Sequence, residues 1–179
     1  MHTLVLQPLL MDHSTFQQPL PNDRFKFVAM PYRLDGVMVT GGPHTYIAQA
    51  AAGLWTTPKD LAKFVISVQQ SLAGNEQVLN LQQAQLMVTP SINKNMGLGF
   101  EIGMNQYGQV ADNGHYFMHM GENEGYRNIL IADTKNGNGL IIMSNMSPDS
   151  NLILKHQATD DWSFFYKIIR QITNAEKWQ

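Results

Sequence analysis

Residues 116–128 read Tyr-Phe-Met-His-Met-Gly-Glu-Asn-Glu-Gly-Tyr-Arg-Asn, and this stretch decides the fold. Strand-forming residues lead into the His-Met-Gly sequence at 119–121, an acidic turn follows, and Gly125 opens a second apolar run that reaches Ala132. Because glycine lacks a Cβ atom, the backbone here can turn tightly or approach a ligand closely. The pattern predicts two strands joined at a polar, glycine-rich edge that can present backbone donors.

The composition limits the classes of function. A chain of 179 residues is about one domain and can bury roughly 70% of its unfolded surface. The net charge of -2 gives no basic surface for nucleic acid, so we expect no nucleic-acid partner. The absence of cysteine excludes disulfides and thiolate metal sites. We expect no transmembrane segment, because no apolar run approaches about 20 residues.

The first residues, 1–5, lack the charged and apolar regions of a secretory signal. Either the protein stays in the cytoplasm or Met1 is not the native start. Residues 3–11 predict a short apolar helix that ends at Pro8.

Residues 56–73 give the clearest helix signal. Thr57 can cap it, Pro58 suits the first helical position, and Asp60 can complete a capping box. Gly74 is a plausible stop. The apolar stripe consists of Leu61, Phe64, Val65, Val68 and Leu72. A shorter helix follows Asn80 and ends before Pro90.

The period changes to that of strands after residue 97. We expect strands at 97–103, 107–110, 115–120, 126–132 and 139–145, with a hairpin turn at Asn136-Gly137 before the last one. Both alternating sets are apolar in the last two strands, which predicts a sheet covered on both faces. A final helix over 160–173, with Asp160 and Asp161 at its positive end, is one cover. Its inner stripe is Trp162, Phe165, Ile168, Ile169 and Ile172.

Residues 22–50 have no clean period and predict a long covering loop. Its aromatic side chains favour packing over disorder: Phe25, Phe27, Tyr32 and Tyr46. The sequence therefore predicts an α+β fold, an antiparallel sheet flanked by helices. We expect residues 1–179 to form a single domain, with 22–50 as a variable covering loop, 97–146 as the sheet and 160–173 as the C-terminal helix.

Several stretches resemble the serine β-lactamase and penicillin-binding-protein-like superfamily, and the nearest branch is that of the class C β-lactamase-related esterases and D-aminopeptidases. Ala-Gly-Leu-Trp-Thr-Thr-Pro-Lys-Asp-Leu-Ala-Lys-Phe at 52–64 is similar to the family's Gly-Leu-Trp-Ser-Thr-x-x-Asp-Leu-Ala-x-Phe. Residues 8–16 resemble Pro-Leu-Gly-Met-x-x-Thr-x-Phe, with Leu10 in place of the usual glycine. Further matches follow in family order at 97–100, 119–121, 125–127 and 144–145.

The resemblance implies a mechanism in which the serine of Ser-x-x-Lys attacks a carbonyl, Tyr-x-Asn helps move the proton, and Lys-Thr-Gly or His-x-Gly lines the site. His119 and Gly121 would hold that third position, and the backbone N–H of Glu122 would be an oxyanion donor. Met120, Asn123 and Tyr126 would contact the substrate. The resemblance implies no cofactor and no metal, and a small-molecule or peptide substrate for the full-length protein.

The family places its serine and tyrosine motifs before the segment that matches residues 4–16. We therefore expect this chain to be the C-terminal portion of such a protein, without the N-terminal helix, the first strands and most of the helical domain. An uncovered sheet edge would then favour self-association. Family members are often exported, so a periplasmic or extracellular location stays open.

Two sequences imitate the missing motifs. Ser91-Ile-Asn-Lys94 fits Ser-x-x-Lys, but a poor helix former follows it, so a chance match is the simpler interpretation. Tyr126-Arg-Asn128 fits Tyr-x-Asn but lies after His119 rather than before it. Tyr126 could line the site or pack beneath it.

Other candidate residues have plainer interpretations. His115 and His119 share a strand face and could bind a metal, but no third ligand has a fitting spacing. His119 could also be structural, and Glu122 and Glu124 could form a solvated turn. Two functions remain: part of a serine hydrolase acting on an ester, amide or β-lactam, inactive alone because its nucleophile is absent, or a non-catalytic binding or assembly module derived from that fold.

Overall fold

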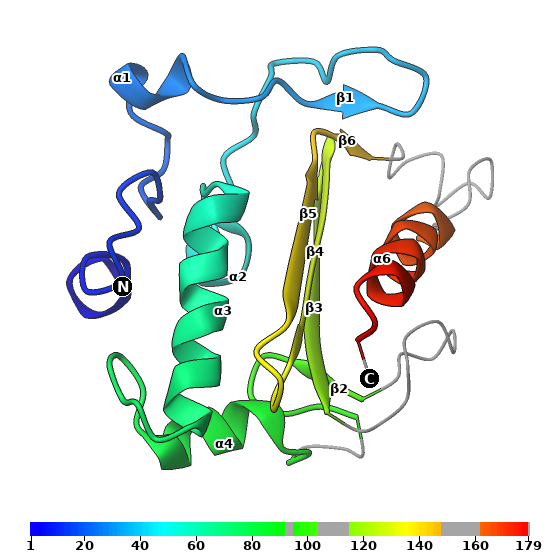
Figure 1. Ribbon diagram of the computed structural model, residues 1–179. Coiled ribbons are helices and arrows are strands. Elements are labelled where there is room, and N and C mark those ends of the chain that lie inside the picture. The colour runs from blue at the N-terminus through cyan, green and yellow to red at the C-terminus, as the bar shows by residue number, and fades with distance from the viewer. Residues whose placement is uncertain (92–94, 104–114, 148–161, 179) are drawn as a thin grey trace.

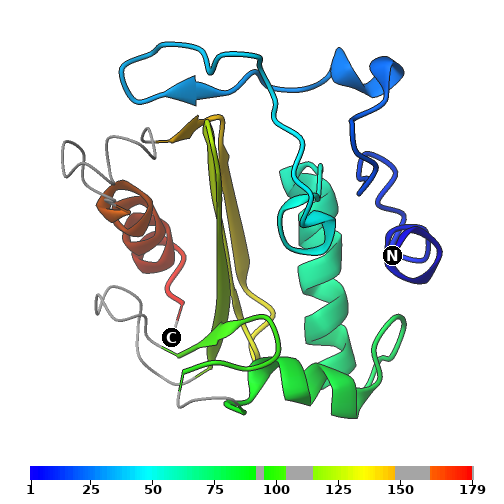
Figure 2. The ribbon, with the colours of Figure 1, turned by 180° about the vertical axis from the view of Figure 1, so that it is seen from behind.

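The computed structural model describes residues 1–91, 95–103, 115–147 and 162–178. Its centre has three layers, which Figure 1 shows edge-on: helix α3 (Pro58–Leu72), a four-stranded sheet, and helix α6 (Ser163–Ala175). The N-terminal segment lies on the far side of α3 from the sheet, as the reverse view in Figure 2 also shows. The predicted α+β fold with an antiparallel sheet between helices is confirmed.

The central sheet has the order β2-β3-β4-β5, and every pair is antiparallel. Its strands are β2 (Glu101–Ile102), β3 (Tyr116–Asn123), β4 (Tyr126–Asp133) and β5 (Gly139–Ser144). The long pair β3–β4 runs in unbroken register from Tyr116 opposite Asp133 to Asn123 opposite Tyr126. The turn before β5 contains Gly137 at φ +77°, in agreement with the predicted hairpin.

Successive residues of β3 and β4 bury side chains on opposite faces, which is the pattern of a sheet covered twice. On one face, Met118 and Ile131 pack with Phe165 and Ile169 of α6. On the other face, Phe117 and Leu130 pack with the α3 side chains of the second cluster, among them Val68. The apolar faces of the two helices therefore hold the sheet between them.

The two most specific family stretches contact each other. Thr57 caps α3 through a bond from the Asp60 N–H at 3.2 Å, and Pro58 takes the first position. The Asp60 carboxylate does not close the predicted capping box; it accepts bonds from the His13 N–H, 2.8 Å, and the Ser14 hydroxyl, 3.0 Å. A tertiary contact thus replaces the local one, and it ties the segment before residue 16 to α3.

Other elements frame this centre. They are η1 (His2–Leu6), α1 (Asn22–Phe25), α2 (Gln49–Ala52), α4 (Leu81–Val88) and the parallel pair β1 (Tyr32–Arg33) and β6 (Met146–Ser147). The helix predicted after Asn80 is α4, which has a full capping box between Asn80 and Gln83. Residues 22–50 cross the end of the sheet above the β3–β4 turn (Figure 1).

Several expectations about the strands and loops need correction. Of the strand expected at 97–103 only Glu101–Ile102 is extended, because Gly99 and Gly103 adopt positive φ angles that break it. The expected strand at 107–110 and the two aspartates at 160 and 161 lie outside the described residues. Phe25 and Phe27 are 42% and 81% exposed, so they do not anchor the covering loop as expected.

Helix α6 also differs in detail from its prediction. It begins at Ser163, and Trp162 precedes it as the cap residue. Tyr166 and Thr173 are buried, whereas Ile168 and Ile172 are only half-buried. The apolar stripe is therefore rotated slightly toward the tyrosine, whose hydroxyl donates to the Met120 sulfur at 3.1 Å.

Candidate active site

The open edge of β3 is the first feature of the site. The Gly103 N–H donates to the Tyr116 carbonyl, so this residue turns its backbone polar groups toward β2. In an antiparallel strand alternate residues share that direction, and Met120 and Glu122 therefore face the same way. Strand β2 pairs only with Phe117 and Met118. In the described chain, the backbone donors of Met120 and Glu122 thus face an edge without a neighbouring strand.

The predicted site residues divide between the two faces of the sheet. His119, Gly121 and Asn123 alternate with Phe117, so they lie on the face that α3 covers. Met120 packs in the opposite cluster, beneath α6. Its side chain and that of His119 consequently cannot line one pocket, although its backbone lies on the shared edge.

His119 is exposed, and one of its ring nitrogens is occupied. Its Nδ1 lies 2.9 Å from the Gly99 carbonyl oxygen, which can only accept a hydrogen bond. Nδ1 therefore carries the proton in the neutral ring, and Nε2 presents a lone pair. This tautomer makes neutral His119 an acceptor of a proton or of a hydroxyl hydrogen bond.

Gly121 borders free space. A Cβ atom built on it would meet nothing within 4 Å, and its φ is not in the left-handed region. Gly125 is the opposite case, with φ +79° and a virtual Cβ only 2.3 Å from the Pro31 Cβ. The fold itself requires glycine at 125, whereas at 121 nothing in the described structure fills the position of the missing side chain.

Tyr126 lies opposite Asn123 and thus on the same face as His119. Its hydroxyl donates to the Ala29 carbonyl at 2.8 Å, and its ring meets Trp55 edge-on at 5.7 Å. Burial, with a smaller contribution from Tyr46, raises the pKa of Tyr126 to about 12. The phenol is therefore neutral near pH 7 and holds the covering loop, a packing role at the margin of the face.

The acidic turn is not freely solvated, contrary to that expectation. Glu122 accepts from Arg127 at 2.8 Å, and this buried guanidinium also lies 4.4 Å from the centre of the Trp162 ring. Glu124 pairs with Arg33 and faces His44. Asn123 donates to the Ala52 carbonyl at 3.1 Å, which ties the end of β3 to α2. The side chains of this turn therefore fix the strand edge in place.

Sequence reasoning missed the partners of this turn that come from the covering segment. Arg33, His44 and Tyr46 all contact Glu124, 78 to 91 residues away in the chain. The aromatic residues of the segment gave the signal that it packs, but no local pattern identifies its partner.

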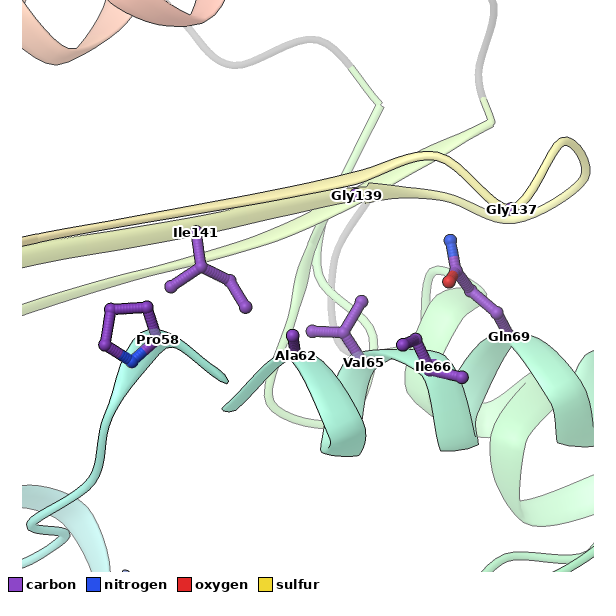
Figure 3. Close-up of a pocket in the computed structure, with 8 residues that line it drawn as sticks. All are labelled: Pro58, Ala62, Val65, Ile66, Gln69, Gly137, Gly139 and Ile141. Carbon is purple, nitrogen blue, oxygen red and sulfur yellow. The ribbon is translucent and has the colours of Figure 1, made fainter. Parts of the chain in front are cut away.

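A groove of about 300 Å³ lies elsewhere, between α3 and β5 (Figure 3). Ala62, Ile66 and Gln69 point from α3 toward the β5 strand, where Ile141 lies opposite. No residue lining it is charged, and the Gln69 amide already donates to two backbone carbonyls, of Asp133 and Asn138, at 2.8 Å each. This groove has the chemistry of a packing surface rather than of a reaction site.

The alternative site residues find no supporting arrangement in the described chain. Ser91 follows the end of α4, outside any helix, and its N–H donates to the Met96 carbonyl; Lys94 lies outside the described residues. His115 Nε2 lies 2.7 Å from the Lys135 ammonium nitrogen. Among the described residues, no group of three or more His, Asp or Glu side chains is placed to hold a metal ion.

A sheet between helices with an open, donor-bearing edge strand defines the β-lactamase and penicillin-binding-protein class of fold. The chain belongs to the Beta-lactamase family, whose model matches residues 1–159. A similar solved structure is the octameric penicillin-binding protein homologue from Pyrococcus abyssi, with 20% identity and a TM-score of 0.59. The match covers 87% of this chain and 36% of that one, so the chain spans about a third of its neighbour. No curated protein matches the sequence.

Within the described part of the chain, no helix combines the length and apolar character needed to cross a bilayer.

Proposed function

We propose that this chain contributes the donor-bearing edge of an acyl-transfer pocket in a β-lactamase-like serine hydrolase. The family membership supports the reaction class, attack of a serine on an ester, amide or β-lactam carbonyl. The observation that carries the proposal is the free space at Gly121 beside the unpaired edge of β3.

Each residue then has a stated role. The Glu122 N–H stabilises the negative charge that develops on the carbonyl oxygen, and one such donor is worth about 3 kcal/mol in the transition state. Gly121 leaves room for the acyl group. His119, through its Nε2 lone pair, accepts a hydrogen bond from a hydroxyl or amide N–H on the same face.

The chain alone should bind acyl compounds without turning them over, because no helix in the described structure carries Ser-x-x-Lys. We expect no hydrolysis of a chromogenic cephalosporin or a p-nitrophenyl ester. Turnover that disappears in Ser91→Ala would overturn this expectation and assign the nucleophile to Ser91.

Binding can be tested by amide NMR titration with a cephalosporin. We expect shifts at residues 119–122 and at least about tenfold weaker binding in Gly121→Val, because the added side chain fills the free space. Gly139→Ala is the matched control, since its Cβ would make only ordinary contacts, the nearest at 3.5 Å. Unchanged affinity in Gly121→Val would refute the pocket.

The second candidate function is assembly, and the other edge of the sheet favours it. Strand β5 ends the strand order, carries neither charge nor proline, and has helices on both faces. Natural edge strands are normally protected by charge, proline or distortion. The neighbour from Pyrococcus abyssi is octameric, which supports a self-associating chain.

Replacing Ile141 by lysine should weaken this association by at least about tenfold in sedimentation experiments, because a charge beside an edge strand opposes pairing. Phe164→Lys, on the exposed outer side of α6, is the control and should leave the association unchanged. A monodisperse monomer of the wild type at high concentration would contradict the assembly proposal.

A further inference from the structure

One residue of the β3–β4 turn, Glu124, is held from three sides by the covering segment. Its Oε1 accepts from Arg33 Nη2 at 3.0 Å, and its Oε2 lies 3.3 Å from His44 Nδ1. Its backbone N–H donates to the Tyr46 hydroxyl oxygen at 3.1 Å. The segment from Arg33 to Tyr46 thus grips the turn that ends the donor-bearing strand.

The His44 ring lies between two acceptors. While Nδ1 faces the Glu124 carboxylate, Nε2 lies 3.1 Å from the Thr40 carbonyl oxygen. Neither oxygen can donate a hydrogen bond, and a neutral imidazole has only one N–H. Only the doubly protonated ring can satisfy both contacts; in the neutral ring one nitrogen lone pair must face an oxygen lone pair.

We propose that His44 is a proton-operated latch that fastens residues 33–46 onto the turn after β3. The groups that face it are the Glu124 carboxylate from the turn and the Thr40 carbonyl from its own segment. Arg33 shares the carboxylate from β1, Tyr46 holds the adjacent N–H, and Asp35 faces the Val37 N–H instead. The latch follows from these contacts alone and does not depend on the proposed catalytic role.

The sign of the effect follows from the contacts. The folded protein binds the protonated ring better than the unfolded chain does, so the latch stabilises fully at low pH. Its contribution falls as pH rises through the range in which histidine titrates. Because the turn begins one residue after Glu122, release of the latch would loosen the cover beside the open edge of β3.

Urea unfolding of the wild type and of His44→Gln tests the latch. Glutamine keeps a donor and an acceptor but does not titrate. The ratio of the two unfolding equilibrium constants should be at least about threefold larger at about pH 5.5 than at about pH 8. His13→Gln is the matched control, since the His13 ring is exposed and only its backbone N–H is bonded to Asp60; its ratio should not change with pH.

A second measurement stands even if the variant folds poorly. In the wild type, the amide resonances of Thr40, Glu124 and Tyr46 should move together with one titration between about pH 5 and pH 8. Amides that do not respond over this range, or a pH-independent ratio for His44→Gln, would overturn the proposal.

Discussion

The centre of the molecule and its covering segment are built by different forces. Between α3 and α6, the sheet is held by side chains such as Phe117 and Met118, both fully buried. Residues 22–50 hold the β3–β4 turn mainly through polar contacts, while Phe27 and Ile47 stand exposed. The comparison teaches that apolar periodicity sets the fold, whereas single long-range polar contacts set the geometry beside the candidate site.

The largest expected effect comes from a pair of phenylalanines. Phe117→Ala should lower the free energy of unfolding by about 3 to 5 kcal/mol, because it leaves a cavity between the sheet and α3. Phe27→Ala should change it by less than about 0.5 kcal/mol, because that ring is exposed. Urea denaturation of both variants measures the difference, and similar losses would remove the distinction between the two regions.

A buried carboxylate gives the next effect. Burial raises the pKa of Asp60, but bonds from Lys63, the His13 N–H and Ser14 outweigh it and hold the pKa below 3.8. Asp60→Asn should cost about 2 to 3 kcal/mol, because the bonds to a charged acceptor are lost.

The same carboxylate predicts a pH dependence. Because the folded pKa is lowered, the stabilisation is complete above the unfolded value near 4 and disappears as pH falls through the folded value. The stability difference between wild type and Asp60→Asn should be constant above about pH 5 and shrink below about pH 4. A difference that grows on acidification would contradict this network.

Much of the fold was predictable because its signals are local. The cap at Thr57, the stop at Gly74, whose φ is +86°, and the alternation of β3 and β4 each concern neighbours in the chain. Asp60 shows the limit of this reasoning: the capping box was the local expectation, but a partner 46 residues away took its carboxylate.

The candidate site was predictable only as far as period 2 reaches. His119 and Gly121 were expected on one face, and the register confirms that they share it. The resemblance grouped Met120 with them as a substrate contact, although the same alternation puts its side chain under α6. Arg33 and His44 belong to a segment without period, so only the tertiary structure identifies their partner.

The smallest expected effect concerns Leu10, which stands where the family has glycine. Its φ is +54°, in the left-handed region, and its side chain is 65% exposed. A non-glycine residue there costs about 1 to 2 kcal/mol, while glycine adds about 0.5 to 1 kcal/mol of chain entropy to the cost of folding. Leu10→Gly should therefore stabilise the protein by about 0.5 to 1 kcal/mol.

The control for this substitution is Leu4→Gly, because Leu4 is also exposed but lies within η1 with no positive φ. It should destabilise the protein by about 1 kcal/mol, since glycine is the poorer helix former. Thermal unfolding of the two variants should therefore shift in opposite directions from the wild type. Shifts in the same direction would mean that Leu10 is not strained, and that the family's glycine at this position needs a reason other than backbone conformation.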